Sequence, residues 1–191
     1  MNNNYLPSDY QTFIATSRYA RWLDDEGRRE TWGETVERYL ENIAKTWLKP
    51  VDLQEVRDAI LSLEVMPSMR SMMTAGKAAD RDNTCMYNCS YLPVDDPKSF
   101  DEAMFILLCG TGVGFSVERQ FITKLPDVPT LFQSETCVVI KDSKEGWAKG
   151  LRQVLALLWA GEIPKWDVSK VRPAGARLKT FGGRASGPAP L

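Results

Sequence analysis

The spacing of hydrophobic positions changes along this chain, and the change predicts two kinds of structure. Over residues 31–50 and again over 52–66, apolar side chains recur every three or four positions, which is typical of amphipathic helices. The first of these runs begins with a capping box, in which Glu34 follows Thr31 by three positions. We therefore expect a helical N-terminal lobe over residues 1–65.

From residue 66 onward, short apolar runs alternate with helical patterns, and this alternation favours an α/β fold. The chain has strand patterns at residues 86–94, 115–117 and 136–140 and helical patterns at residues 97–110 and 142–161. A parallel sheet needs helices on both faces and neighbours at its edges. Because so few strands cannot provide these, we expect another chain or further sequence to complete the sheet. The alternative is a small α+β domain with a disordered tail.

The charge balance gives no reason to expect a nucleic-acid or membrane partner. The 191 residues include 24 Lys and Arg against 25 Asp and Glu, so the formal net charge is −1. The first residues lack the basic start and apolar run of a signal peptide, and no run of about 18 apolar residues could span a membrane. We expect a cytoplasmic protein in which any phosphate is held by a local site.

Cysteine is the residue type through which this chain is best equipped to do chemistry. The sequence has four cysteines and no histidine, which excludes Ser-His and Cys-His nucleophile pairs within the chain and argues against a zinc site. In a cytoplasmic protein, four cysteines are not expected to form a structural disulfide framework. Cysteine redox chemistry, backbone contacts and carboxylates remain.

Cys89 is the first candidate for such chemistry, because it lies within a predicted strand. A cysteine that projects from a strand into a pocket can deliver reducing equivalents if a second thiol lies within disulfide reach. In a regular strand Cys85 would point to the same face as Cys89 but lie about 13 Å away, too far for a disulfide. The partner thiol is therefore expected elsewhere. The alternative is that Cys89 is merely a small buried hydrophobic residue.

Two glycine-containing segments can bring the backbone close to a ligand. Gly110, Gly112 and Gly114 follow a helix and lead into a strand, which is the reverse of the dinucleotide-binding fingerprint, and the segment lacks the lysine of a P-loop. A helix C-cap with a turn is the simpler interpretation of this segment. Residues 172–187 combine glycines with cationic side chains that either bind phosphates or form an exposed basic connection.

Taken in order, these and other segments resemble the adenosylcobalamin-dependent (class II) ribonucleotide reductases, especially the branch of monomeric ribonucleoside-triphosphate reductases. The resemblance runs along nearly the whole chain, and no single segment decides it. The matching positions are residues 19–23, 27–28, 32 and 34–36, then 67–68 and 70, 88–89, 112–117, 142 and 145–147, 172–173 and 175, 181–183 and 185–188.

The resemblance implies a ten-stranded α/β barrel made of two half-barrels, with residues 66–191 supplying the first half-barrel. It also implies that Cys89 is one of two cysteines that reduce the ribose 2′-position and end as a disulfide. The family's radical-bearing cysteine, the Asn and Glu that assist it and the C-terminal cysteine pair are not recognisable here. We therefore expect a C-terminal reductase half to bring these groups and most of the adenosylcobalamin site, a thioredoxin-like protein to act as reductant, and this chain to be inactive alone.

Binding roles follow from the resemblance position by position. Substrate binding is implied for Met66, Pro67, Ser68, Asn88, Cys89 and Gly112. Binding of a dNTP or ATP effector is implied for Asp96, Lys98 and Ser99, although Asp96 is equally natural as a helix cap. A loop that relays effector identity to substrate choice is implied for Arg172, Gly175, Arg177, Lys179 and Phe181. No metal ligand is expected.

One departure from the family bears on allostery, because we expect the branch's long insertion to be missing between Val117 and Asp142. Cys85, Cys109 and Cys137 match no family role. Our hypothesis is that the chain is the N-terminal subunit or fragment of a reductase that acts on ribonucleoside triphosphates or diphosphates. The alternatives are an incomplete piece of a longer reductase, and a regulatory or scaffolding module that binds nucleotide without catalysis.

Overall fold

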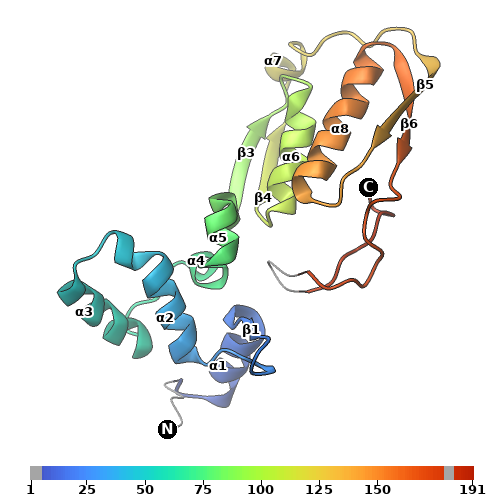
Figure 1. Cartoon of the computed structure of the whole chain (residues 1–191). Helices are drawn as coiled ribbons and strands as arrows, with labels where there is room; N and C mark the ends of the chain where they lie inside the picture. The colour runs from blue at the N-terminus through green and yellow to red at the C-terminus, as the bar shows by residue number, and fades with distance from the viewer. Residues whose placement is uncertain (1–5, 179–182) are drawn as a thin grey trace. The chain divides into compact units, whose positions relative to one another are not determined.

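The computed structural model describes residues 6–178 and 183–191, and these residues divide into two compact units. The N-terminal unit ends at Tyr87, and the C-terminal unit begins at Asn88 (Figure 1). Residues 66–87, which the sequence assigns to the start of the half-barrel, lie in the N-terminal unit. The assignment of a functional domain to residues 66–191 stays a prediction.

The N-terminal unit is mostly helical and is built around helix α2 (Trp32–Asn42). Its core contains Trp32, Val36 and Leu40 from α2, packed with Ile60 and Met72. The other elements of this unit are α1 (Asp9–Ile14), a π-helical turn (Ala15–Tyr19), the strands β1 (Trp22–Leu23) and β2 (Arg28–Arg29), a 3-10 turn (Ala44–Thr46), α3 (Pro50–Leu61), α4 (Met69–Thr74), α5 (Lys77–Arg81) and a second 3-10 turn (Asn83–Met86).

The capping box expected at the start of α2 is present. The Thr31 hydroxyl accepts a hydrogen bond from the Glu34 backbone N–H, and the Glu34 carboxylate accepts one from the Thr31 backbone N–H. The helix is shorter than its apolar pattern predicts, because the chain turns at Ile43. The next helix begins at Pro50, two residues earlier than predicted, since proline suits the first position of a helix.

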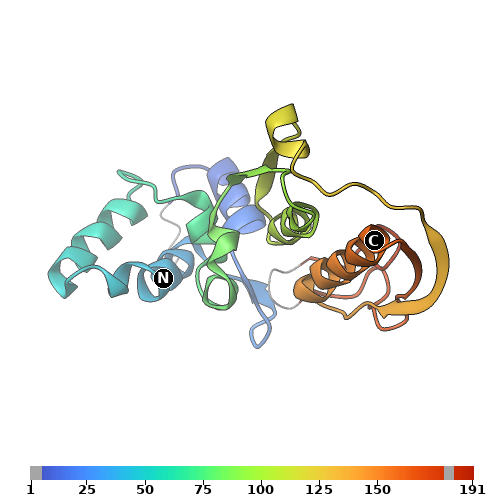
Figure 2. The same cartoon turned by 90° about the horizontal axis from the view of Figure 1, so that it is seen from above.

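The C-terminal unit consists of two parallel β-α-β arrangements. Strand β3 (Cys89–Pro93) pairs with β4 (Gly112–Ser116) through helix α6 (Lys98–Leu108). Strand β5 (Phe132–Val139) pairs with β6 (Glu162–Asp167) through helix α8 (Lys144–Trp159). A short helix, α7 (Arg119–Ile122), lies between the two arrangements in sequence. Helices α6 and α8 pack side by side (Figures 1 and 2).

This arrangement confirms a mixed α/β fold with small parallel sheets, while a closed barrel is not seen among the described residues. Two strands start earlier than their apolar patterns suggest. Strand β4 begins at Gly112 and β5 at Phe132, because the hydrogen-bonded ladder extends over glycines and polar residues that carry no strand signal. The β5–β6 ladder has a register shift between Gln133 and Cys137.

Helix α8 approaches the end of β5 closely through two glycines. A Cβ atom on Gly146 would lie 2.5 Å from the Lys141 carbonyl oxygen, and one on Gly150 would collide with the Ile140 Cδ1 atom. Ile140 belongs to the core of this unit together with Val138 and Val171. At Gly146 the helix can pack here only because the position lacks a side chain, whereas at Gly150 the neighbour is a side chain that can move.

Candidate functional site

Cys89 is the first residue of β3, and its side chain is exposed. The parallel register places Cys89 opposite Gly112 and Tyr91 opposite Gly114. Because side chains alternate along a strand, Cys89 and Tyr91 share one face of the pair with both glycines. The thiol therefore lies beside a strip of backbone that no neighbouring side chain on β4 covers.

The two interpretations of the glycine segment can now be separated residue by residue. Gly110 has φ of 86° and follows helix α6, so it is the expected C-terminal glycine of that helix. Gly112 has no positive φ, and an added Cβ would make only an ordinary 3.5 Å contact with the Asn88 carbonyl oxygen. Neither backbone conformation nor local packing requires glycine at position 112. The open space that it leaves beside Cys89 is then available to a ligand.

Among the residues predicted to bind substrate, the structure brings Asn88, Cys89 and Gly112 together. The Gly112 backbone N–H donates to the Asn88 carbonyl oxygen at 2.9 Å, and the Ser90 hydroxyl donates to the Gly112 carbonyl oxygen at 3.1 Å. These bonds fix the register of the strands around the thiol. Ser68, by contrast, caps helix α4 in the N-terminal unit, where Met66 and Pro67 also lie.

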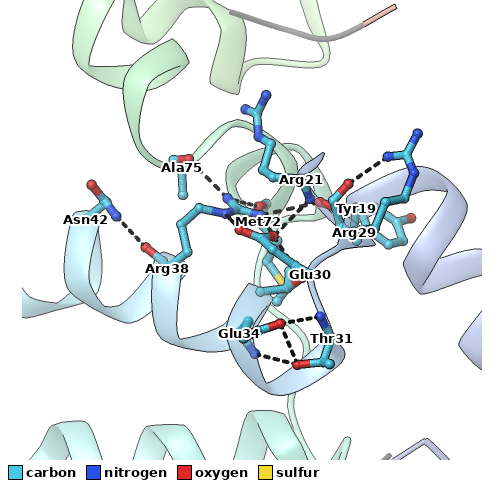
Figure 3. Close-up of polar contacts among 12 residues, drawn as sticks. Tyr19, Arg21, Arg29, Glu30, Thr31, Glu34, Arg38, Asn42, Met72 and Ala75 are labelled. Atoms are coloured by element: carbon cyan, nitrogen blue, oxygen red, sulfur yellow. Dashed lines mark hydrogen bonds and ion pairs between the residues drawn. The ribbon is translucent and has the colours of Figure 1, made fainter. Parts of the chain in front are cut away.

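The N-terminal unit contains a buried ion-pair network that our sequence reasoning missed. The Glu30 carboxylate accepts hydrogen bonds from the Arg38 guanidinium, the Arg21 backbone N–H and the Thr35 hydroxyl (Figure 3). Arg38 also donates to the backbone carbonyl oxygens of Met72, Ala75 and Tyr19. The only sequence signals were Arg38, on the helix that carries the apolar stripe, and Glu30, directly before the capping residue Thr31.

This network holds helix α4, and with it the segment that contains the predicted substrate residues 66–68. Arg38 binds the carbonyl oxygens at the end of α4, which carry partial negative charge. Burial, and then the nearby charge of Arg38, lower the pKa of the Arg21 guanidinium. Met66 and Met72 also line an apolar cavity of about 250 Å³ between α1 and α4.

The cysteines other than Cys89 have different surroundings. Cys85 lies in a 3-10 turn of the N-terminal unit and is fully buried, so it does not share a regular strand with Cys89. Cys137 is exposed on β5, and Cys109 is fully buried at the end of α6. None of the four cysteines, all of which lie within the described residues, forms a disulfide.

The predicted effector residues surround the start of helix α6. Asp96 is exposed, and its carboxylate accepts a hydrogen bond from the Lys98 backbone N–H at 2.8 Å. Ser99 is buried, and its hydroxyl donates to the Pro93 carbonyl oxygen at 3.0 Å. The hydrogen bond of Asp96 is thus a local one to a residue two positions later, and its carboxylate faces solvent. The Ser99 hydroxyl, in contrast, is already bonded to a backbone carbonyl oxygen of the fold.

The described residues of the predicted relay loop belong to an antiparallel hairpin, in which residues 175–178 pair with residues 183–185. Arg172 donates from Nε to the Asp142 carboxylate at 2.7 Å, immediately before the start of α8. Further along, Arg177 and Arg184 form an antiparallel bridge, and Gly175 donates its backbone N–H to the Ala185 carbonyl oxygen. Lys179 and Phe181 lie outside the described residues.

The two grooves that border α8 are too small to enclose adenosylcobalamin. Two open grooves of the C-terminal unit, both bordered by α8, measure about 610 and 570 Å³. Grooves of this size suit drug-sized ligands, and a corrin with its adenosyl group is larger. Residues 6–178 and 183–191 also contain no group of three or more side chains able to hold a metal ion.

No helix in this part of the chain is long and apolar enough to cross a bilayer.

Comparison with known proteins gives matches to one family along the chain. A sequence model described as "B12-dependent ribonucleotide reductase, insertion domain" matches residues 117–191. An adenosylcobalamin-dependent ribonucleoside-triphosphate reductase of Lacticaseibacillus paracasei is 29% identical over 252 positions, which cover 91% of this chain and 33% of that protein. A putative enzyme of the same description from Mycobacterium phage D29 is 28% identical, over 91% of this chain and 30% of the phage protein.

The fold agrees with these matches. A solved structure of a B12-dependent (class II) ribonucleotide reductase superposes with a TM-score of 0.76 over 93% of this chain and 35% of that one, at 23% identity. The chain thus spans about a third of the length of the proteins it matches.

The expectation that the insertion is missing between residues 117 and 142 needs correction. The insertion-domain model matches from residue 117 to the last residue of the chain, so sequence of this kind is present. The Lacticaseibacillus alignment nevertheless runs over 252 positions, more than the 191 residues here, so that relative contains segments without a counterpart in this chain.

Proposed function

Because this chain is related to the adenosylcobalamin-dependent ribonucleotide reductases, we propose that it provides part of the catalytic domain of such an enzyme. The observation that carries the proposal is the position of Cys89, exposed at the start of a parallel strand and opposite Gly112. We propose that the two β-α-β arrangements belong to the first half of the family's ten-stranded barrel. The substrate is a ribonucleoside triphosphate, the substrate that the relatives' names state.

In the proposed reaction Cys89 is one of two thiols that reduce the ribose. Both thiol hydrogens are used, one to replace the 2′-hydroxyl group and one to release that group as water, and the two sulfurs join as a disulfide. The product is a 2′-deoxyribonucleotide. The second thiol comes from another part of the enzyme, which also brings the radical-bearing cysteine, its Asn and Glu, and most of the site for adenosylcobalamin. That cofactor supplies the radical chemistry when bound.

Gly112, opposite Cys89, and Gly114, opposite Tyr91, leave this face of the strand pair open to a ligand. Backbone at Gly112 and Gly114 can approach the nucleotide closely because no side chain intervenes. The Asn88 segment and residues 66–68 complete the proposed substrate contacts. A thioredoxin-like dithiol protein restores the thiols, and we place the enzyme in the cytoplasm, where such reductants keep cysteines reduced.

We further propose that an effector nucleotide binds at the start of α6, where the Asp96 carboxylate accepts a hydrogen bond from the effector's sugar. The signal reaches the substrate through the hairpin that begins at Arg172. Its ion pair with Asp142 couples this hairpin to helix α8, which packs against α6. Such a relay is a coupling free energy between two sites.

The test is a cysteine replacement in the assembled reductase, this chain together with the rest of the enzyme. Cys89→Ser should abolish repeated formation of deoxyribonucleotide with a dithiol reductant, while homolysis of the bound cofactor continues. Cys137→Ser is the matched control, because Cys137 is also an exposed cysteine on a strand of the same unit. Normal multiple-turnover activity of Cys89→Ser would refute the redox role.

A further inference from the structure

Cys109 and Lys144 form a contact that the proposed reaction does not use. The Lys144 Nζ atom donates to the Cys109 Sγ atom at 3.1 Å, and it also lies 4.9 Å from the centroid of the Phe105 ring. Cys109 is fully buried and directly follows helix α6, whereas Lys144 is the first residue of α8. The contact therefore joins the end of one helix to the start of the other.

The position of Lys144 is unfavourable for a cation in one respect. The first turn of a helix carries partial positive charge, so an ammonium group there is opposed by the helix dipole, typically by about 0.3–1 kcal/mol. The aromatic ring and the thiol attract the ammonium group and offset this cost. Sulfur and nitrogen are thus held together by the packing of α6 against α8, and no rearrangement is needed to bring them into contact.

We propose that Cys109 and Lys144 are a site of oxidative cross-linking, in which peroxide converts the contact into a covalent sulfur–nitrogen bond. In the first step hydrogen peroxide oxidises the thiol to a sulfenic acid and releases one water. In the second step the Lys144 ammonium group gives up one proton to water, the resulting neutral amine attacks the sulfur, the S–O bond breaks, and the hydroxyl group leaves with an amine hydrogen as a second water. Sulfur loses two electrons, the peroxide gains them, and the condensation is redox-neutral.

The surroundings of Cys109 favour this outcome over the usual fates of an oxidised thiol. Sulfenic acids normally condense with another thiol, but Cys109 is fully buried, so a large external thiol such as glutathione is kept out. Peroxide is not much larger than water and reaches such a site through small openings of the fold. The Lys144 Nζ atom is already in contact with the sulfur, so it is in position to attack the oxidised thiol.

The bond would join two segments to which the proposed function gives different roles, one in substrate binding and one in the effector relay. Cys109 lies three residues before Gly112, which faces Cys89, and Lys144 lies two residues after Asp142, which binds Arg172. Oxidation would therefore fix the strand beside Cys89 to the hairpin that begins at Arg172. The chemistry itself does not depend on the reductase assignment, so each proposal can fail without the other.

The experiment is mass spectrometry of the full chain after treatment with hydrogen peroxide under native conditions. We expect one joined peptide pair, Cys109 with Lys144, two hydrogen atoms lighter than the sum of its parts and released by dithiothreitol. Cys109 recovered as a free thiol, as a sulfinic acid, or in a bridge one oxygen atom heavier would each overturn the proposal.

Two variants make the result specific. Lys144→Arg keeps a cation over the ring but removes the nucleophilic amine, so the cross-link should vanish while the melting temperature stays near that of the unmodified chain. Lys149→Arg replaces an exposed lysine of the same helix and should leave the yield unchanged. If Lys144→Arg does not fold, the peptide joined to Cys109 in the unmodified chain still tests the proposal. Linkage of Cys109 to any other lysine would contradict it.

Discussion

Arg38 and Glu30 form a two-point ion pair in the interior of the N-terminal unit, with Nε and Nη2 each within 2.9 Å of a carboxylate oxygen. Only 15% of the Arg38 side chain and 6% of the Glu30 side chain is exposed. Removal of one partner would leave the other charge buried. We expect Arg38→Met to lower the free energy of unfolding by about 3–5 kcal/mol, measured by urea denaturation.

A control for this variant lies nearby. Arg57 pairs with Glu37 at 2.6 Å, but both side chains are 39% exposed. Arg57→Met should cost about 1 kcal/mol or less, because exposed ion pairs contribute little. Equal losses in the two variants would contradict the structural role given to the Arg38–Glu30 pair.

The capping box of α2 predicts a pH dependence. A hydrogen bond from Arg28, and then one from the Thr31 backbone N–H, lower the pKa of Glu34 from 4.5 to about 2. The stabilisation is complete above pH 4.5, where the unfolded chain is ionised too, and it is lost as the pH falls towards 2. The stability difference between the unmodified chain and Glu34→Gln should therefore shrink over this interval, in denaturation curves recorded at successive pH values.

The same pH series on Glu41→Gln provides the comparison, since Glu41 is an exposed glutamate of the same helix. Its stability difference should change less with pH than that of Glu34→Gln. A difference for Glu34→Gln that stays constant from neutral pH down to strongly acid pH would show that the ion pair does not form in solution.

Thiol accessibility should divide the four cysteines into two pairs. Cys89 and Cys137 are exposed, and Cys85 and Cys109 are fully buried. We expect a small alkylating reagent to modify the first two in the native chain and the other two only after denaturation, as read by peptide mass spectrometry. Rapid native modification of Cys85 would contradict the buried 3-10 turn in which it lies.

The glycines of α8 should differ in their tolerance of alanine. At Gly146 the new methyl group would meet backbone at Lys141, so the helix or the strand must shift, at a cost of about 1–3 kcal/mol. At Gly150 it would meet only the end of the flexible Ile140 side chain, and the better helix propensity of alanine offsets part of that cost. Thermal unfolding should therefore rank Gly146→Ala as the less stable variant, and the reverse order would contradict the close contact.

Periodicity and caps located most of the regular elements. Thr31 and Glu34 identified the start of α2, and apolar runs located β3, α6 and α8, because these signals act within a few residues of chain. Strand β4 was placed too late, since the ladder holds Gly112 and Gly114 through backbone bonds to which side chains do not contribute. The short helices α4 and α5 were missed because their order depends on tertiary contacts, including those of Arg38 with Met72 and Ala75.

The candidate site was less predictable than the fold. The resemblance to the family led to both Cys89 and Gly112, but their position opposite each other follows only from the register of β3 with β4. The Glu30 network and the Cys109–Lys144 contact join positions whose spacing has no local pattern, since Lys144 lies 35 residues after Cys109. Such pairs are decided by packing, and packing is not visible in a single sequence.

The parallel pairing of β3 with β4 also has a kinetic consequence. Cys89 meets Gly112 only after the intervening crossover has closed a long loop, whereas the β1–β2 pair joins residues as close as Leu23 and Arg28. Contacts between residues distant in sequence form late, because the chain loses the entropy of loop closure before the contact contributes any favourable free energy. We therefore expect Cys89 to reach its place beside Gly112 among the last events of folding, so that a half-folded chain does not yet contain the assembled form of the proposed site.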